Sequence, residues 1–142
     1  MAELNVSRKN IQGLLSLNDP TTKGKIFVIP EYQRPYRWEV DTCDVLWNDL
    51  KNFFEEHKDD DREYFLGSIV TCDDTDEQNR INIIDGQQRI TSFLLLLRAF
   101  YYKLEDQLVD NPSDEEVEGL MKSIEPCIWK INPMTKKVSN KK

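Results

Sequence analysis

The residues best suited to chemistry in this chain form a short run, Asp85-Gly86-Gln87-Gln88-Arg89, directly after an apolar segment. A strand that turns at Asp-Gly straight into a helix leaves the first helical N–H groups without intrahelical partners. These groups lie at the positive end of the helix dipole, where they bind anions such as phosphate. An arginine in the first turn can add a bidentate contact, and glutamines offer uncharged donors and acceptors. The run therefore indicates a phosphate site.

Asp85 adds a carboxylate at the same turn. It could hold Mg²⁺ through water or orient an attacking water, because one or two carboxylates usually hold Mg²⁺ together with substrate phosphates. A purely structural interpretation is also open, in which Asp85 caps the helix and Arg89 pairs with a surface carboxylate. An Asp-Gly turn before a helix is less specific than a P-loop, so spacing alone leaves both interpretations standing.

A second set of such residues is the run 30–38, which reads Pro-Glu-Tyr-Gln-Arg-Pro-Tyr-Arg-Trp. Its prolines restrict the residues before them and remove backbone donors, so we expect an extended loop. The planes of Tyr32 and the arginines could stack on a base while Arg34 contacts a phosphate. The alternative is a surface loop ordered by its prolines, whose aromatic side chains pack on the core.

The elements before this loop and after it follow from periodicity. Residues 11–15 predict a short helix with Ser7 as N-cap, ending near residues 18–20, and the β-branched and aromatic run at residues 25–29 predicts a strand. A helix from about Asp41 to His57, capped by Asp41 or Thr42, follows from spacings of three and four. The residues on its apolar face are Leu46, Leu50, Phe53, Phe54 and His57.

The central segments predict a hairpin and a long helix. Residues 64–72 are typical of a mostly buried strand, and residues 80–84 predict its partner after an acidic turn. One helix should run from Gln87 or Gln88 to about Val109, apolar on more than one face at residues 94–97. Ser113 with Glu116 has capping-box spacing for another helix through about Ile124.

Composition fits one domain of 142 residues, with 39% apolar residues. The net charge of −7 comes mainly from residues 55–77, which carry two basic and ten acidic side chains, so charge neither supports nor forbids a phosphate ligand.

The three separated cysteines suggest reduced thiols, and a lone histidine excludes a histidine-based nuclease site. No membrane span or signal peptide is visible, which predicts a cytoplasmic location.

Three segments, residues 29–38, residues 65–70 and residues 84–92, resemble in order and spacing the three blocks of the GmrSD-type restriction endonuclease N-terminal domain family. The Asp-Gly-Gln-Gln-Arg run is that family's signature. The family usually continues Leu-Thr-Thr, and this chain departs mildly with Ile90-Thr91-Ser92, which keeps both hydroxyls. The resemblance covers roughly residues 11–105.

The resemblance implies an α/β fold of the α+β kind, similar to ParB and sulfiredoxin, with a small mixed sheet packed with helices and a long helix after the signature. It also implies binding and Mg²⁺-dependent hydrolysis of a nucleoside triphosphate, GTP or another. On this basis Asp85, Gln88 and Arg89 are expected to be catalytic, with Asp85 also the metal ligand. The expected phosphate-binding or nucleotide-binding residues are Gly86, Gln87, Gln88, Arg89, Thr91, Tyr32, Gln33, Arg34 and Arg37.

The resemblance points to a regulatory domain of a modification-dependent restriction system that defends against phage. The alternative function is a non-hydrolytic module that senses or contacts modified DNA through Tyr32-Gln33-Arg34. Nuclease activity is not expected of this chain alone. We expect residues 1–142 to form a single domain, the N-terminal part of a larger protein that acts on DNA, with a frayed basic tail at 135–142. The apolar residues 94–97, with Tyr101 or Trp129 nearby, predict self-association through exposed apolar surface.

Overall fold

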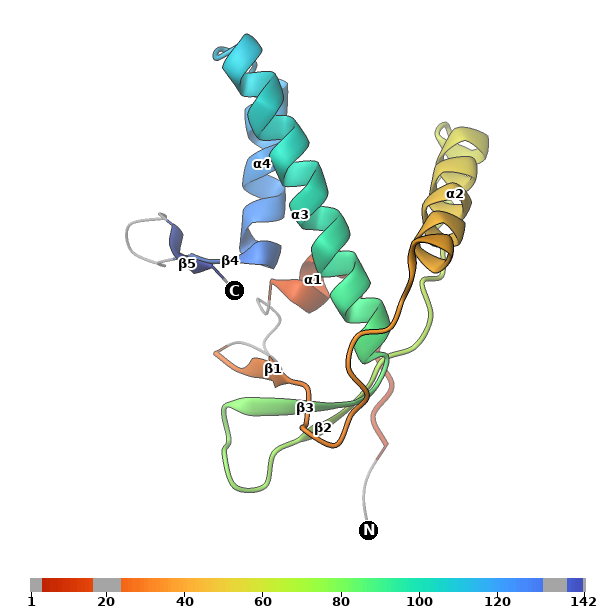
Figure 1. Cartoon of the computed structure of the whole chain (residues 1–142), viewed down its shortest axis with the longest axis vertical. Coiled ribbons are helices and arrows are strands. Elements are labelled where there is room, and N and C mark those ends of the chain that lie inside the picture. Colours follow the sequence, from red (N-terminus) through yellow and green to blue (C-terminus); the bar gives the residue numbers. More distant parts are fainter. Residues whose placement is uncertain (1–3, 17–23, 132–137, 142) are drawn as a thin grey trace. The chain divides into compact units, whose positions relative to one another are not determined.

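The computed structural model of the chain describes residues 4–16, 24–131 and 138–141 (Figure 1). Within these residues it has four helices, a three-stranded mixed sheet and a two-stranded sheet, which confirms the α+β fold class. The chain divides into two compact units, residues 27–93 and residues 1–26 with 94–142.

The three-stranded sheet has the order β1-β3-β2 and is built from β1 (Ile26–Val28), β2 (Val70–Asp73) and β3 (Arg80–Asp85). Strands β2 and β3 form the predicted antiparallel hairpin, with Thr71 opposite Ile83. Alternate residues of β3, Ile81 and Ile83, are buried, as expected for a strand with one face on a core.

The prediction of a mostly buried strand over residues 64–72 is wrong. Only β2 is a strand there, all four of its residues are exposed, and residues 61–69 are irregular. Gly67 has a φ of 102°, in the left-handed region, so the backbone cannot stay extended through it. An apolar run alone does not show such a break.

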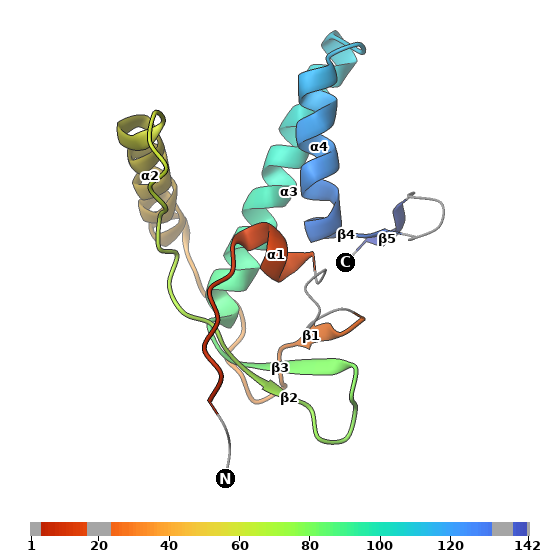
Figure 2. The same cartoon turned by 180° about the vertical axis from the view of Figure 1, so that it is seen from behind.

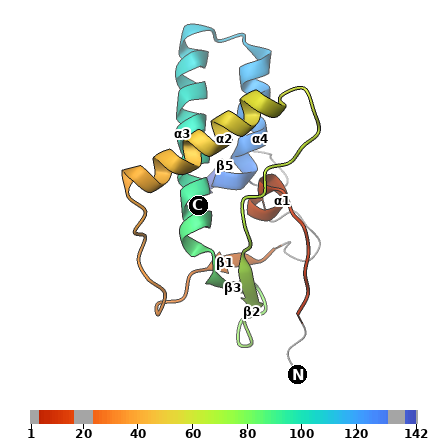
Figure 3. The same ribbon diagram turned by 90° about the vertical axis from the view of Figure 1, so that its right-hand side faces the viewer.

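Helix α2 (Val40–His57) has the predicted extent but has no buried residue, and Phe54 of its expected apolar face is exposed. In unit 27–93 two irregular segments, residues 29–39 and 58–69, join this helix to the sheet (Figure 3). The residue before the helix is Glu39, which makes no side-chain cap, so the predicted caps Asp41 and Thr42 are wrong. Both residues lie inside the first turn, whereas the N-cap position is the residue immediately before the helix.

The other unit contains α1 (Ile11–Leu15), the C-terminal part of α3 (Gln87–Asp110), α4 (Glu115–Ile128), and the antiparallel pair β4 (Trp129–Ile131) and β5 (Val138–Lys141). Residues 94–110 of α3 run beside α4 in both views (Figures 1 and 2). Strand β5 lies in the tail that was expected to be frayed.

Two of the predicted caps in this unit are displaced. Asn10, not Ser7, caps α1 and accepts a hydrogen bond from Gly13 N at 2.7 Å. Asp114 caps α4 by accepting from Val117 N at 3.0 Å, so the box of Ser113 and Glu116 is wrong. In each case the cap is the polar residue immediately before the helix, because only that position reaches the free N–H groups. The predicted end of α1 near residues 18–20 lies outside the described residues.

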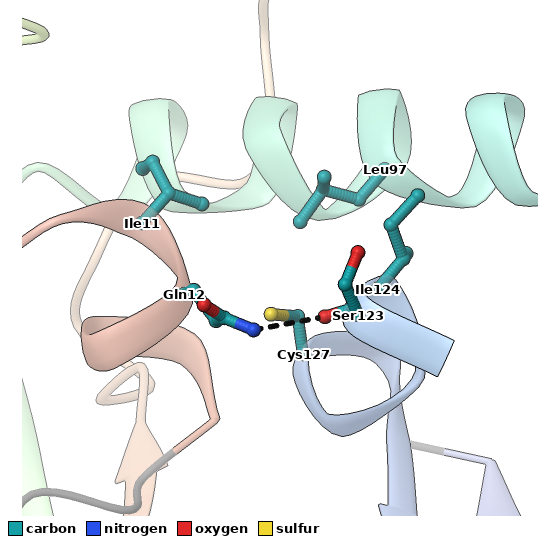
Figure 4. A pocket seen from close by; sticks show the side chains of 6 residues that line it. All are labelled: Ile11, Gln12, Leu97, Ser123, Ile124 and Cys127. Atoms are coloured by element: carbon teal, nitrogen blue, oxygen red, sulfur yellow. Dashed lines mark hydrogen bonds between the residues drawn. The ribbon is translucent and has the colours of Figure 1, made fainter. Parts of the chain in front are cut away.

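Tyr101 and Trp129 are buried, which corrects the expectation that they lie in an exposed apolar surface. Of residues 94–97, Leu95 is exposed and the other three are half-buried. A small hollow of about 260 Å³ lies between α1, α3 and α4, where Gln12 Nε2 donates to Ser123 O at 3.3 Å (Figure 4). None of the site residues predicted from the sequence lines it.

Candidate functional site

Gly86 makes the turn from β3 into α3 that the sequence predicts. Its φ is 92°, and the first helical bond runs from Ile90 N to Gly86 O at 3.0 Å. The N–H groups of residues 87–89 therefore lie outside the helical pattern, and the described residues supply them with no hydrogen-bond partner. The left-handed φ favours glycine, and a Cβ at residue 86 would also lie close to its neighbours, 2.9 Å from Ile69 Cδ1 and 3.3 Å from Ser68 O.

Gln33 and Gln87 attach the loop of residues 30–38 to this turn. Gln33 Nε2 donates to Ile84 O at 3.0 Å, and Gln87 Nε2 donates to Gln33 Oε1 at 3.0 Å. Gln87 is only 7% exposed, so its amide belongs to the interior of the unit. Residues separated by about 50 positions in the sequence thus meet, as expected for one site.

Gln88 attaches the second half of the same loop. Its Oε1 accepts from Arg37 N at 2.7 Å, and its Nε2 donates to Pro35 O at 3.0 Å. Arg34 O lies 3.5 Å from the same nitrogen. Both ends of the Gln88 amide are therefore used to hold the loop that carries two arginines.

Arg89 is half-buried, and among the residues that the structure describes no carboxylate pairs with it. Its Nη1 donates to Ser68 O at 2.7 Å. The guanidinium lies over Gly67, where a Cβ would come within 2.7 Å of Arg89 Cζ. The second sequence block thus meets the third through Arg89, and the φ of 102° at residue 67 favours the glycine of that block.

The hydroxyls after the signature are bonded within α3. Thr91 Oγ1 donates to Gln87 O and Ser92 Oγ donates to Gln88 O, both at 2.8 Å. The Tyr36 hydroxyl lies 2.9 Å from Ser92 Oγ. Burial raises the pKa of Tyr36 above its ordinary value, so the phenol stays protonated at neutral pH and can donate to Ser92.

Among the site residues predicted from the sequence, four have exposed polar side chains: Tyr32, Arg34, Arg37 and Asp85. The guanidinium groups of both arginines have no hydrogen-bond or ion-pair partner among the residues that the structure describes. Tyr32 is 76% exposed, so its ring is not packed on the core as the alternative interpretation of the loop requires. These are the groups that a ligand could reach.

The three sequence blocks thus converge at the start of α3. Over residues 12–141 the chain matches the family described as GmrSD restriction endonuclease, N-terminal domain. The chain belongs to this family. Among curated proteins none matches the chain. The family resemblance seen in the sequence is confirmed, and this GmrSD N-terminal domain is accordingly a domain of a restriction system.

Four residues of this GmrSD N-terminal domain make contacts at the site but were not among the predicted site residues: Gly67, Ser68, Tyr36 and Ser92. All four lie inside the three quoted blocks, which was the available signal, but their roles depend on contacts across the fold. Ser68 acts through its backbone carbonyl, and no residue-type pattern reveals that.

Asp85 is a single exposed carboxylate at the end of β3. Within the described part of the chain, no three acidic, histidine or cysteine side chains cluster to hold a metal ion. This donor set fits Mg²⁺ only as an ion that a triphosphate carries, with Asp85 as one added ligand. Of the helices in the described ranges, none is long and apolar enough to span a bilayer.

Proposed function

We propose that this domain binds a nucleoside triphosphate, GTP or another, and hydrolyses it to regulate a modification-dependent restriction system. The observation that carries the proposal is the attachment of the arginine-bearing loop to the start of α3 by Gln33, Gln87 and Gln88. This attachment keeps two unpaired guanidinium groups in the same unit as the three free N–H groups of the Gly86 turn. Phosphate is the ligand that such donors prefer.

Each exposed group has a role in this proposal. The N–H groups of residues 87–89 and the positive end of the helix dipole hold one phosphate, and Arg34 and Arg37 neutralise the others. Tyr32 stacks on the base, and Asp85 orients the attacking water. Bound Mg²⁺ would neutralise charge on the phosphates, with Asp85 as its protein ligand.

The glutamines act as positioning residues in this proposal. Gln88 was expected to be catalytic, but both ends of its amide are bonded to the loop. Its contribution to hydrolysis is therefore to hold Arg37, and Gln87 holds the loop through Gln33. Arg89 is also a positioning residue in this proposal. Its bond to Ser68 O holds residues 67–68 next to the Gly86 turn.

Calorimetric titration with GTP and the other triphosphates tests the proposal on Arg34→Ala/Arg37→Ala. Each charge-assisted contact contributes about 1.5–3 kcal/mol, so the double variant should bind at least about a hundredfold more weakly. Arg62→Ala is the matched control, because that exposed arginine pairs with the surface carboxylate of Asp60 and lies outside the loop of residues 30–38. Equal affinity of the double variant and the control would remove the loop arginines from the site.

The second candidate function is DNA contact by the same loop. The exposure of Tyr32 beside two unpaired arginines favours it, since aromatic and arginine side chains also stack on nucleobases. DNA binding without nucleotide should weaken steeply with salt, whereas triphosphate binding should need Mg²⁺ and no polymer. Fluorescence anisotropy with a duplex at several salt concentrations separates the two.

A further inference from the structure

Tyr36 is attached to the start of α3 at three points. The peptide groups on both sides of it bond to the Gln88 side chain, through Pro35 O at 3.0 Å and Arg37 N at 2.7 Å. The Tyr36 hydroxyl lies 2.9 Å from Ser92 Oγ. Gln88 and Ser92 are four residues apart on α3, so they lie on the same face of the helix. The backbone and the side chain of residue 36 are therefore held by one turn of one helix.

The neighbouring bonds fix the direction of the bond between Tyr36 and Ser92. A serine hydroxyl has one proton, and Ser92 donates it to Gln88 O at 2.8 Å. Tyr36 must therefore donate to Ser92 Oγ. The phenolic oxygen keeps its lone pairs, and Cys43 Sγ in the first turn of α2 lies 3.7 Å from it. A thiol is a weak donor, and with it the hydroxyls form a chain of hydrogen bonds that strengthen one another.

These attachments fix the backbone of Arg37 more firmly than that of Arg34. Arg37 directly follows the attached tyrosine, and its own N–H is one of the three points. The contact near the first arginine is longer, since Arg34 O lies 3.5 Å from Gln88 Nε2. The hydroxyl bond therefore acts mainly on Arg37, whereas Arg34 depends on the bonds of its neighbour Gln33.

The hydroxyl of Tyr36, rather than its ring, is what this attachment requires. The residue is 38% exposed, so its ring is only partly covered. Ser92 is 6% exposed, and a hydrogen bond to its oxygen is therefore shielded from water. A shielded bond is stronger than one on the surface, because water competes less for the donor and the acceptor.

We infer that Tyr36 and Ser92 are positioning residues that fix Arg37 for contact with the triphosphate before the nucleotide binds. The inference rests on the proposed function, because it uses the phosphate contact assigned there to Arg37. A backbone that is fixed in advance needs less ordering on binding, which raises the affinity. The two hydroxyls act through Arg37 and make no contact with the nucleotide.

Amide hydrogen exchange, measured by NMR on the whole chain without nucleotide, tests whether the hydroxyl holds the backbone. Tyr36→Phe keeps the ring and removes the bond, so exchange at Arg37 N should be about two- to tenfold faster. Gln33 N, which donates to Pro30 O at 3.0 Å in the first half of the loop, should keep its rate. An unchanged rate at Arg37 would overturn the inference, as would equal acceleration at both amides.

Two further variants show whether the bond itself is responsible. Ser92→Ala removes the acceptor and should also accelerate exchange at Arg37. Its combination with Tyr36→Phe should give less than the product of the two single effects, because both changes remove the same bond. Tyr64→Phe is the matched control in the same unit, since no residue that the structure describes bonds to that hydroxyl. The full product in the combined variant would overturn the inference, as would acceleration by the control.

Calorimetric titration with GTP, UTP, CTP and ATP in the presence of Mg²⁺ tests the link to the ligand. Tyr36→Phe should weaken binding about two- to tenfold in the wild type and in Arg34→Ala, but less than about twofold in Arg37→Ala. Equal weakening in both arginine variants would indicate a general loss of packing and overturn the inference. The proposed function fails on a different result, absence of binding by the wild type, and the exchange rates are measured without nucleotide.

Discussion

The two ends of α3 are held by different kinds of interaction. In unit 27–93, side-chain amides bond the start of the helix to the loop, with Gln87 and Gln88 together engaging Gln33, Pro35 and Arg37. These bonds require donors and acceptors at fixed positions. An amide network of this kind is sensitive to geometry and is suited to placing ligand-binding groups.

Residues 94–110 of α3 are held in the other unit by aromatic packing. The rings of Tyr101 and Trp129 meet edge-on at 5.9 Å, and the guanidinium of Arg98 lies 4.2 Å from the centroid of the Trp129 ring. Such contacts depend on volume and buried area rather than on precise donors. We therefore expect substitutions at the aromatic end to change stability, and those at the amide end to change ligand binding as well.

Trp129→Ala should have the largest effect on stability. Removing a buried aromatic side chain costs about 3–5 kcal/mol, because the cavity fills only partly. Urea unfolding should show a lower midpoint, whereas nucleotide affinity per folded molecule should stay at the wild-type value. Loss of affinity in the folded fraction would show that the two ends of α3 are not separable.

Gly86→Ala should lower both the stability of the domain and its affinity for nucleotide. The backbone at residue 86 is left-handed, and strain there costs about 1–3 kcal/mol for a residue with a Cβ. The Cβ would also press on Ile69 and displace the turn that offers the N–H groups. Calorimetry should show nucleotide affinity reduced by more than about tenfold. Wild-type affinity in a folded variant would mean that the phosphate lies elsewhere.

Gln87→Ala should cost about 1–3 kcal/mol, because it leaves the Gln33 carbonyl oxygen without a donor in a part-buried site. A double-mutant cycle with Gln33→Ala measures the coupling. If the amides act as one network, the double variant should be more stable than the sum of the single effects predicts. Strict additivity would contradict the bond between the two side chains.

Tyr101→Phe should have the smallest effect at neutral pH, about 1.5 kcal/mol, because the lost bond to the Glu125 carboxylate is only part-buried. Burial and this carboxylate raise the pKa of Tyr101 to about 12 in the folded chain, above the ordinary value of 10.0. The resulting stabilisation is complete below pH 10 and disappears as pH rises toward 12, because the unfolded chain loses this proton first. Stability of the wild type should thus fall more steeply than that of Tyr101→Phe across this window.

Local patterns predicted the extents of the helices α2 and α3 and the presence of the β2–β3 hairpin, though not the start of β2, because periodicity and turn residues act over a few positions. The N-cap residues of the helices were predicted less well. A shift of the helix start by one to three residues changes which side chain reaches the free N–H groups. Burial was the weakest prediction. The apolar face of α2 looks like a core face in sequence, yet nothing in the sequence shows whether a neighbour covers it.

The site was predictable as three blocks but not as a set of roles. The order and spacing of the blocks predicted that residues 30–38 and 84–92 belong to one site, and the structure shows that they are in contact through Gln33 and Gln88. The sequence could not show that the glutamines hold the loop while Arg34 and Arg37 stay open. That division depends on which side chains face inward across the fold.

The most direct test of the nucleotide site is calorimetric titration of the purified chain with GTP, UTP, CTP and ATP, each with and without Mg²⁺. Saturable binding of at least one triphosphate in the presence of Mg²⁺ is the predicted result, with loss of that binding in the Arg34→Ala/Arg37→Ala variant. Absence of binding by all four nucleotides to folded wild-type protein would contradict the account.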